Sequence, residues 1–263
     1  MRGMGGHGWR MINPNGLVLW EGPSRINGDP IICIVTGLKQ KTSNRKVGDQ
    51  LQSWILAADT PPHKAIKNGK SRSVCGGCRH DTQKKTGKRS CYVVTHHAPL
   101  SVYSAFKRGS YAEVNWETWP DLVRGRFGRL GSYGDPAALP LSVLDRFCAP
   151  LDGWTGYTHQ SASPRLRDAL RYCQVSADSL QDAEAARAGG FGSFRVLGPD
   201  SEPRQPWEMH CPASKEKGYR KTCQECGVCN GRGGSHVVIN AHGTGSVNFT
   251  EYNRRPLTLP ILT

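Results

Sequence analysis

The chain has 263 residues, enough for one large domain or two small ones with a core that needs no disulfide bonds. Its 35 lysines and arginines against 21 acidic residues give a net charge of +14, which is compatible with a nucleic-acid partner but equally with a well-solvated surface. No stretch approaches the roughly 20 apolar residues of a membrane span, and the amino terminus lacks the apolar core of a signal peptide. We therefore expect a cytoplasmic protein without a membrane segment, whose ten cysteines are metal ligands or reactive thiols.

The first sixty residues predict a small lobe. Two short apolar runs, residues 17–20 and 31–36, are rich in β-branched side chains and separated by turn signals, which predicts a β-hairpin. Between residues 47 and 58 apolar side chains recur at helical spacing, which predicts an amphipathic helix. We therefore expect a hairpin-and-helix lobe over residues 1–60 and a cysteine-rich α/β unit over residues 61–263, either separate or continuous with the lobe.

The larger unit begins with a basic, glycine-rich segment, residues 61–90, which we interpret as a loop. Beyond it, strand-like runs alternate with helical ones. The predicted strands cover residues 91–95, 127–131, 153–157, 172–176, 191–196, 207–210 and 236–240, and the predicted helices cover residues 99–107, 116–124, 139–147, 164–171 and 179–188. Because this alternation is typical of βαβ units, we predict a partial (β/α) barrel with a mainly parallel sheet.

Polar residues follow several of the predicted strands. Functional groups of α/β barrels collect at strand ends, so Asp135, His159 and Asp178 are candidate catalytic residues that line a substrate pocket. The glycine-rich end of the strand at residues 127–131 supplies candidate cofactor-binding residues, namely Gly131, Tyr133 and Gly134. Each has a simpler interpretation as well, because Asp and Gly favour turns and His159 fits an ordinary surface position.

Four cysteines fall within residues 211–229. Cys223, Cys226 and Cys229 follow the spacing C-x2-C-x2-C, and Cys211 lies upstream, directly before a proline. This run with a remote Cys-Pro is typical of 4Fe–4S ligation, whereas structural zinc more often uses two separated C-x2-C knuckles or mixes cysteine with histidine. The sequence therefore predicts a metal site, with a 4Fe–4S cluster favoured and zinc as the alternative.

A second thiol group lies nearer the amino terminus and consists of Cys75, Cys78 and Cys91. Three thiols without an evident fourth indicate a cluster with one open iron, which can bind a substrate or S-adenosylmethionine. The alternative is a zinc knuckle completed by one histidine, either His80, His96 or His97. The other cysteines sit in apolar runs and are expected to be buried in the core: Cys33, Cys148 and Cys173.

With these residues in view, the chain resembles a family of uncharacterised, cysteine-rich bacteriophage proteins. The shared sequence motifs extend along most of the chain and include Cys75-x2-Cys78, Cys91-Tyr92, Tyr133-Gly-Asp-Pro-Ala137, Thr155-Gly-Tyr-Thr-His-Gln160, Cys211-Pro-Ala-Ser214 and Cys223-x2-Cys226-Gly-Val-Cys229. The arrangement is also distantly similar to phage proteins regarded as radical-SAM-like. Those proteins usually carry C-x3-C-x2-C, and the first thiol group here departs from that run with C-x2-C-x12-C.

The resemblance implies a phage-encoded iron–sulfur protein in the cytoplasm of an infected host cell. It implies an enzyme with radical-SAM-like chemistry, one or two 4Fe–4S clusters, S-adenosylmethionine and an electron donor. The basic surface would approach a nucleotide or nucleic acid. The alternative hypothesis is a non-enzymatic phage protein in which zinc holds both thiol groups and Lys/Arg-rich loops contact nucleic-acid phosphates.

Overall fold

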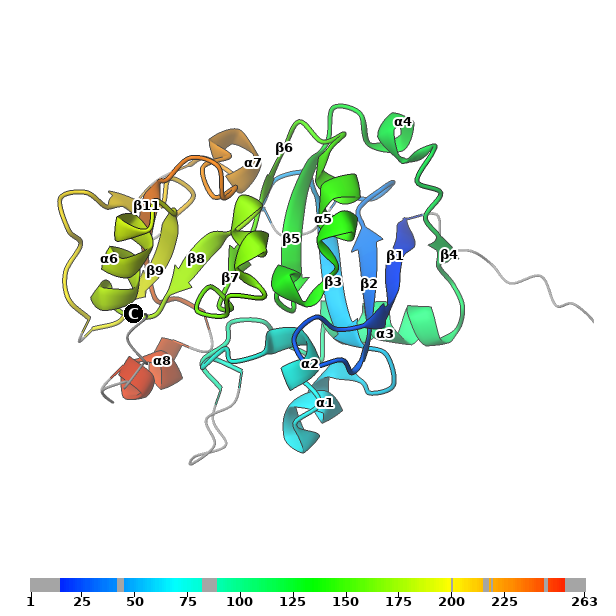
Figure 1. The fold of residues 1–263 in the computed structure, drawn as a ribbon, viewed down its shortest axis with the longest axis horizontal. Helices are drawn as coiled ribbons and strands as arrows, with labels where there is room; N and C mark the ends of the chain where they lie inside the picture. The colour runs from blue at the N-terminus through cyan, green and yellow to red at the C-terminus, as the bar shows by residue number, and fades with distance from the viewer. Residues whose placement is uncertain are drawn as a thin grey trace, which may run out of the picture.

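A computed structural model describes residues 15–41, 45–81, 89–199, 201–214, 218, 220–243 and 246–253 of the chain. Its strands form two sheets (Figure 1). The first sheet contains β1 (Gly16–Pro23), β2 (Pro30–Thr36), β3 (Gln50–Ala57), β4 (Ala112–Glu113), β5 (Phe127–Tyr133) and β6 (Gly153–Thr155), in the order β4-β1-β2-β3-β5-β6. The second contains β7 (Tyr157–Thr158), β8 (Gln174–Ala177), β9 (Ser193–Leu197), β10 (Met209–His210) and β11 (His236–Asn240), in the order β10-β11-β9-β8-β7.

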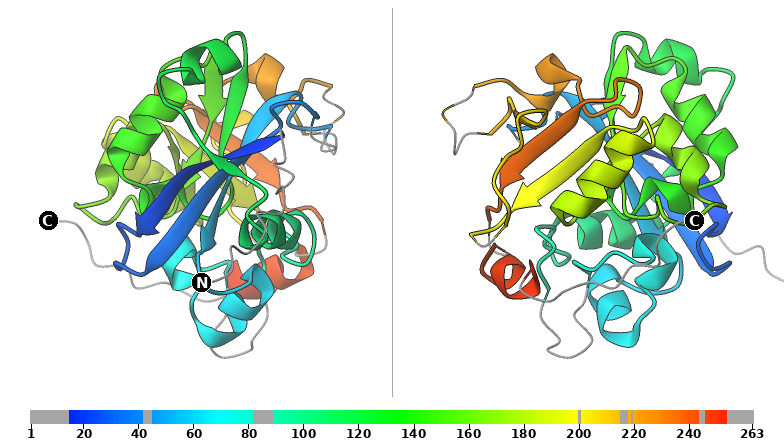
Figure 2. Two further views of the ribbon diagram at one scale, coloured as in Figure 1. Left: turned by 90° about the vertical axis from the view of Figure 1, so that its right-hand side faces the viewer. Right: turned by 60° about the vertical axis from the view of Figure 1, so that its left-hand side comes forward.

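The helices of the described residues include α1 (Pro62–Asn68), α2 (Arg72–Cys75), α3 (Ala98–Lys107), α4 (Trp119–Val123), α5 (Leu141–Cys148), α6 (Leu180–Ala188), α7 (Cys223–Cys226) and α8 (Ser246–Asn253), with 3-10 turns at η1 (Pro136–Ala138) and η2 (Arg167–Arg171). In the view of Figure 1, α1, α2 and α8 lie below the two sheets. The turned views of Figure 2 show α6 packed against the second sheet, where it contacts β8 and β9. In the described part of the chain, no helix combines the length and the apolarity needed to cross a bilayer.

The predicted amino-terminal hairpin is confirmed. β1 and β2 pair antiparallel, with Leu17 opposite Val35 and Glu21 opposite Ile32. Every residue from Ile31 to Val35 is buried, so β2 is an interior strand covered on both faces. This coverage explains the continuous apolar run of its sequence, which shows no polar alternation.

The predicted helix over residues 47–58 is wrong, because most of this segment forms β3. β3 lies between β2, to which it pairs antiparallel, and β5, to which it pairs parallel. A strand buried on both faces shows no period-two pattern, so the helical spacing of its apolar residues was accidental. Two of its buried polar residues have partners, since Gln52 accepts a 2.6 Å hydrogen bond from Ser132 and Ser53 accepts one of 2.9 Å from the Gly131 amide, whereas the buried Gln50 side chain has none among the described residues.

The alternation of strands and helices beyond residue 95 is largely confirmed. α5 connects the parallel neighbours β5 and β6, and α6 connects β8 and β9. The fold is therefore a mixed α/β structure, with a mainly parallel first sheet and a parallel second sheet. Gly156 alone separates β6 from β7, so one nearly continuous segment belongs to both sheets. Among the described residues, the hydrogen-bonded strand pairs do not close a barrel.

Three local predictions differ from the structure. Residues 61–90 are not simply a loop, because they contain α1 and α2. The predicted strand at residues 91–95 is irregular, since Tyr92 and Val94 are exposed and no neighbouring strand pairs with them. The predicted helix at residues 164–171 is limited to the short 3-10 turn η2.

One large hydrophobic core fixes the strands of the first sheet. Trp119 is 1% exposed, its ring stacks on Phe147 at 5.5 Å, and its indole N–H donates to the Phe147 carbonyl at 3.3 Å. Full burial of side chains of this kind contributes roughly 1.5–3 kcal/mol each. The three cysteines expected in the core are buried as predicted: Cys33, Cys148 and Cys173.

Candidate functional site

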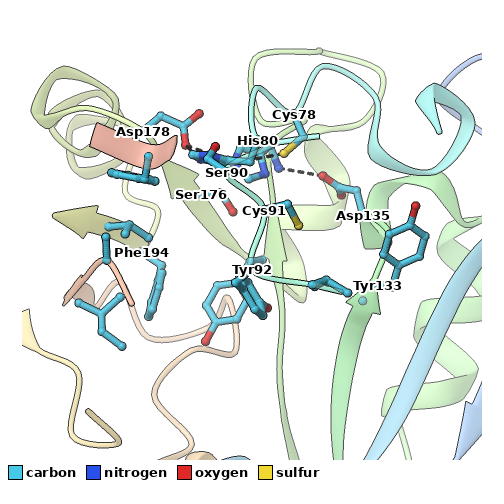
Figure 3. Close-up of a pocket in the computed structure, with 18 of the residues that line it drawn as sticks. Cys78, His80, Ser90, Cys91, Tyr92, Tyr133, Asp135, Ser176, Asp178 and Phe194 are labelled. Carbon is cyan, nitrogen blue, oxygen red and sulfur yellow. Dashed lines mark hydrogen bonds and ion pairs between the residues drawn. The ribbon is translucent and has the colours of Figure 1, made fainter. Parts of the chain in front are cut away.

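A cavity of about 470 Å³ runs along the sheets. Residues that follow β5, β7 and β8 line it, and so do Arg129, Phe194 and Ile239 within strands. Thiols from both predicted groups line it, namely Cys75, Cys78, Cys91, Cys211 and Cys223. Its other walls include Tyr133 and Phe194, which Figure 3 shows on opposite sides of Tyr92. Small-molecule sites typically enclose roughly 300–1,000 Å³, so the cavity has the size of a ligand site.

The first thiol group is shaped by the end of α2. The helix stops at Cys75, because Gly76 adopts a left-handed backbone with φ 57°. A Cβ at Gly76 would lie 2.4 Å from the Gln160 side chain, so only glycine fits there. The Cys78 amide then donates to the Cys75 carbonyl at 3.1 Å, and this tight turn brings the first two thiols of the group together.

Cys91 joins this group through the backbone, since its amide donates to the His80 carbonyl at 3.0 Å. Burial raises the pKa of the Cys75 thiol well above its ordinary value, and Asp81, Cys78 and Cys91 nearby raise it further. Burial likewise raises the pKa of Cys91. Thiols in such surroundings lose their protons when a metal cation binds them, because the cation supplies the compensating charge.

The second thiol group is organised by the short helix α7. Thr222 caps it, because its hydroxyl accepts from the Glu225 amide at 3.2 Å while the Glu225 carboxylate accepts from the Thr222 amide at 2.7 Å. Gly227, with φ 62°, ends the helix after Cys226. This capping box holds the residues that follow Thr222 in one compact turn, as the C-x2-C spacing requires.

The outer members of the second group are tied to neighbouring strands. Cys211 follows β10, and its amide donates to the Val238 carbonyl of β11 at 2.8 Å. The Cys229 carbonyl accepts from the Gly156 amide at 2.8 Å. Burial raises the pKa of the Cys229 thiol, although a hydrogen bond from Tyr157 opposes that shift, and the charges of the other three thiols act on it as well. All four predicted thiols therefore lie in one neighbourhood.

Asp135 is a fully engaged buried carboxylate. Its Oδ1 accepts from the Ala137 amide at 3.0 Å, and its Oδ2 accepts from the His159 amide at 2.8 Å and from Gln160 Nε2 at 3.3 Å. Gln160 Nε2 also donates to the Cys75 carbonyl at 3.1 Å. Asp135 thus joins the end of β5 to the segment after β7, and through Gln160 to the first thiol group.

His159 and Asp178 meet in the cavity together with His80. Asp178 Oδ1 lies 2.7 Å from His80 Nε2 and 3.3 Å from His159 Nε2, and Figure 3 shows Asp178 turned toward His80. Burial alone would raise the pKa of Asp178, but the charges and hydrogen bonds of the two histidines hold it well below its ordinary value. Burial alone would lower the pKa of His159, yet Cys78 and Asp178 raise it well above its usual range.

The glycine-rich end of β5 lines the same cavity. Gly131 and Gly134 have φ values of 63° and 82°, and a Cβ at either position would lie 2.4 Å or 2.6 Å from a backbone carbonyl oxygen. Both glycines are therefore required by the sharp bend that presents Tyr133 and Asp135 to the cavity.

Neither a protein-family model, nor a curated protein, nor a solved structure matches this chain. The side-chain chemistry of the cavity therefore carries the functional argument.

Several cavity residues are not among the predicted site residues. The sequence predicts His80 only as an alternative zinc ligand and gives Arg129 no role in a site. Arg129 donates to the Tyr92 hydroxyl at 2.7 Å, and its Nε is buried without a hydrogen-bond partner. Strand alternation places Arg129 two residues before Gly131 and four before Tyr133, a period-two signal that could have found it.

Proposed function

We propose that the chain is a phage-encoded iron–sulfur protein with radical-SAM-like chemistry on a nucleotide or nucleic-acid substrate. One observation carries the proposal: thiols of both cysteine groups line a single cavity of about 470 Å³, which reaches the edge where β5, β7 and β8 end. Ligand sites of α/β proteins commonly lie at this edge of a parallel sheet. A reactive centre in one wall of this cavity would therefore face a bound substrate directly.

The proposal includes a partial (β/α) barrel. Because only Gly156 separates β6 from β7, the parallel order β5, β6/β7, β8, β9 and β11 continues from one sheet into the other. The Gly156 carbonyl accepts from the Gln174 amide at 2.9 Å, so the pairing with β8 begins at the interruption itself. Helices α5 and α6 connect successive parallel strands, as the outer helices of such barrels do.

The first thiol group suits a 4Fe–4S cluster with one open position. All ten cysteines belong to the described residues, and those outside the two groups are buried in the core, so Cys75, Cys78 and Cys91 have no fourth thiol of their own. Since these three thiols line the cavity, a fourth ligand would come from a molecule bound there. S-adenosylmethionine is the ligand that we propose.

The second thiol group suits a fully ligated cluster. Its four thiols are partly or fully buried, and the Tyr157 hydroxyl contacts one of them, Cys229. Hydrogen bonds to cluster sulfur atoms and limited solvent access set the reduction potential of such centres. We propose that Cys211, Cys223, Cys226 and Cys229 hold a cluster that is structural or relays electrons from a donor protein.

In the proposed mechanism, Cys75, Cys78 and Cys91 would hold a cluster that, once reduced by an electron donor, would supply one-electron chemistry to S-adenosylmethionine. The chain's own residues bind and orient the reactants. Asp135 holds the His159 segment against the first thiol group, and His159 and Asp178 line the substrate pocket. Lys46 and Arg129 give one wall of the cavity positive charge, which favours an anionic group such as the phosphate of a nucleotide.

Metal and sulfide analysis tests the proposal. Protein purified without oxygen should contain iron and acid-labile sulfide in equal amounts and show visible charge-transfer absorbance. Cys75→Ser should lower the iron content, whereas Cys148→Ala, which removes a core thiol, should leave it unchanged. Stoichiometric zinc without labile sulfide would instead support the zinc-stapled alternative and refute this proposal.

The salt dependence of oligonucleotide binding tests whether the substrate is a nucleic acid. If several basic side chains contact phosphates, the logarithm of the affinity for an oligonucleotide must fall steeply and linearly with the logarithm of the salt concentration. A flat response would exclude a phosphate-binding surface and restrict the substrate to a small molecule.

A further inference from the structure

We propose that His80, His159 and Asp178 form a third metal site, which binds one divalent transition-metal ion beside the first thiol group, where His159 Nε2 lies 3.9 Å from Cys78 Sγ. The ligand atoms of these three side chains all lie within 4.8 Å of one another. They come from three different segments: His80 from the loop after α2, His159 from the end of β7, and Asp178 from the end of β8. The inference goes beyond the proposed function, because it rests on none of the thiols.

The inner geometry converges on one point. Both imidazole Nε2 atoms face the same carboxylate oxygen of Asp178, at 2.7 Å for His80 and 3.3 Å for His159. The side chains of His80, His159 and Asp178 are only 12%, 22% and 10% exposed. Two histidines and one carboxylate are the ligand set of many zinc and non-haem ferrous sites, so the class of ion is a divalent first-row metal.

Outer partners hold these ligands in a metal-binding orientation. Ser90 Oγ lies 2.8 Å from His80 Nδ1, which directs Nε2 of the same ring toward the cavity. The second oxygen of Asp178 is bound by Arg79 Nε at 2.8 Å, which leaves the first oxygen for the ion. Metal-ligating histidines and carboxylates usually have second partners of this kind, which fix the ring tautomer and the carboxylate rotamer.

The site has a closed side and an open side. The ring of Phe249 stacks on His80 with centroids 5.3 Å apart, and this contact covers one face of the imidazole. All three ligands line the cavity, so the coordination positions that they leave open would face its interior. An ion there would bind water or an oxygen or nitrogen atom of the substrate.

The experiment compares cobalt binding by reconstituted protein and by two isosteric variants. His80→Gln and Asp178→Asn should each bind one Co²⁺ fewer per chain than the wild type and lose a d–d absorption band, while the acid-labile sulfide content, which reports the clusters alone, stays unchanged. His63→Gln, which changes a histidine of α1 outside the cavity, should bind cobalt as the wild type does. Equal cobalt binding by all four proteins would overturn the proposal and leave the three residues as a hydrogen-bonded network only.

A measurement on the wild type alone tests the proposal even if the variants do not fold. X-ray absorption of the added cobalt should show a nitrogen and oxygen shell with imidazole scattering, and a shell of sulfur alone would also overturn the proposal. Metal analysis of the purified protein then distinguishes zinc from ferrous iron. Because sulfide is measured separately, loss of the iron–sulfur assignment and loss of this site are distinguishable results.

Discussion

Replacing Asp135 tests whether this carboxylate holds the site together. In Asp135→Ala the buried amides of Ala137 and His159 lose their acceptors, which are 3.0 Å and 2.8 Å away in the wild type. An unsatisfied buried donor costs about 1–3 kcal/mol, so the free energy of unfolding should fall by about 2–6 kcal/mol. Asp135→Asn keeps one acceptor oxygen and places an amide NH2 against one donor, so its cost should be about half as large.

Equilibrium urea unfolding, followed by tryptophan fluorescence in metal-free protein under reducing conditions, measures these differences. Asp152→Ala is the control, because this exposed aspartate lies just before β6 and its removal should change stability by less than about 0.5 kcal/mol. The reasoning would be refuted if Asp135→Ala were no less stable than the control. It would also be refuted if the asparagine variant were as unstable as the alanine variant.

Three further predictions concern a buried ion pair, the core thiols and one glycine. Glu208→Gln should lower the free energy of unfolding by about 3–5 kcal/mol in urea titrations, because it leaves the buried Arg195 guanidinium uncompensated. Burial alone would raise the pKa of Glu208, but the hydrogen bonds that it accepts from Arg195 lower it. The wild type should therefore lose this stability as the pH falls through the lowered pKa of Glu208, whereas the stability of the variant should not depend on pH in this way. Iodoacetamide followed by mass spectrometry should modify the half-buried thiols of Cys78 and Cys226 in chelator-treated protein but spare the core thiols of Cys33, Cys148 and Cys173, and labelling of these three in folded protein would contradict their burial. Gly76→Ala should reduce the metal bound per chain, because its φ/ψ of 57°/−125° suits only glycine and its Cβ would meet Gln160. Gly69→Ala, with an αL backbone and nothing within 4 Å of its Cβ, should not, and equal losses would refute this role of Gly76.

Local patterns predicted most of the strands and helices. The helix α6 has the signals that the sequence offers most clearly, with Ser179 as its cap and alanines on its buried side. β2 is buried on both faces, yet its run of β-branched residues predicts a strand. β3 is equally buried but escaped prediction, because polar residues interrupt its apolar run and leave the apolar ones at helical spacing. The segment from Cys91 to Thr95 has strand-like composition, but a strand also needs a pairing partner, and a partner is a property of the whole fold.

The sequence predicts which thiols and which strand-end residues belong to the candidate site, but it does not predict the contacts between them. Spacing alone indicated that Cys223, Cys226 and Cys229 belong together, because ligands of one cluster are often close in sequence. The contact between His80 and Asp178 joins residues that are 98 positions apart, so no motif could have paired them. The lining of one cavity by both cysteine groups likewise depends on how the fold brings segments far apart in the sequence to the same cavity.

The single residue between β6 and β7 connects two otherwise distant parts of the molecule. The Gly156 amide bonds to Cys229, its carbonyl bonds to the strand that leads to Asp178, and His159 follows three residues later. A Cβ at Gly156 would lie 2.9 Å from the Cys173 sulfur, so the packing around this residue leaves no room for a side chain. Removing the metal from the carboxyl-terminal thiols should therefore speed amide hydrogen exchange in their own loop and also along β7, the strand that leads to His159. Metal binding at one end of the protein would then be a condition for order at the other.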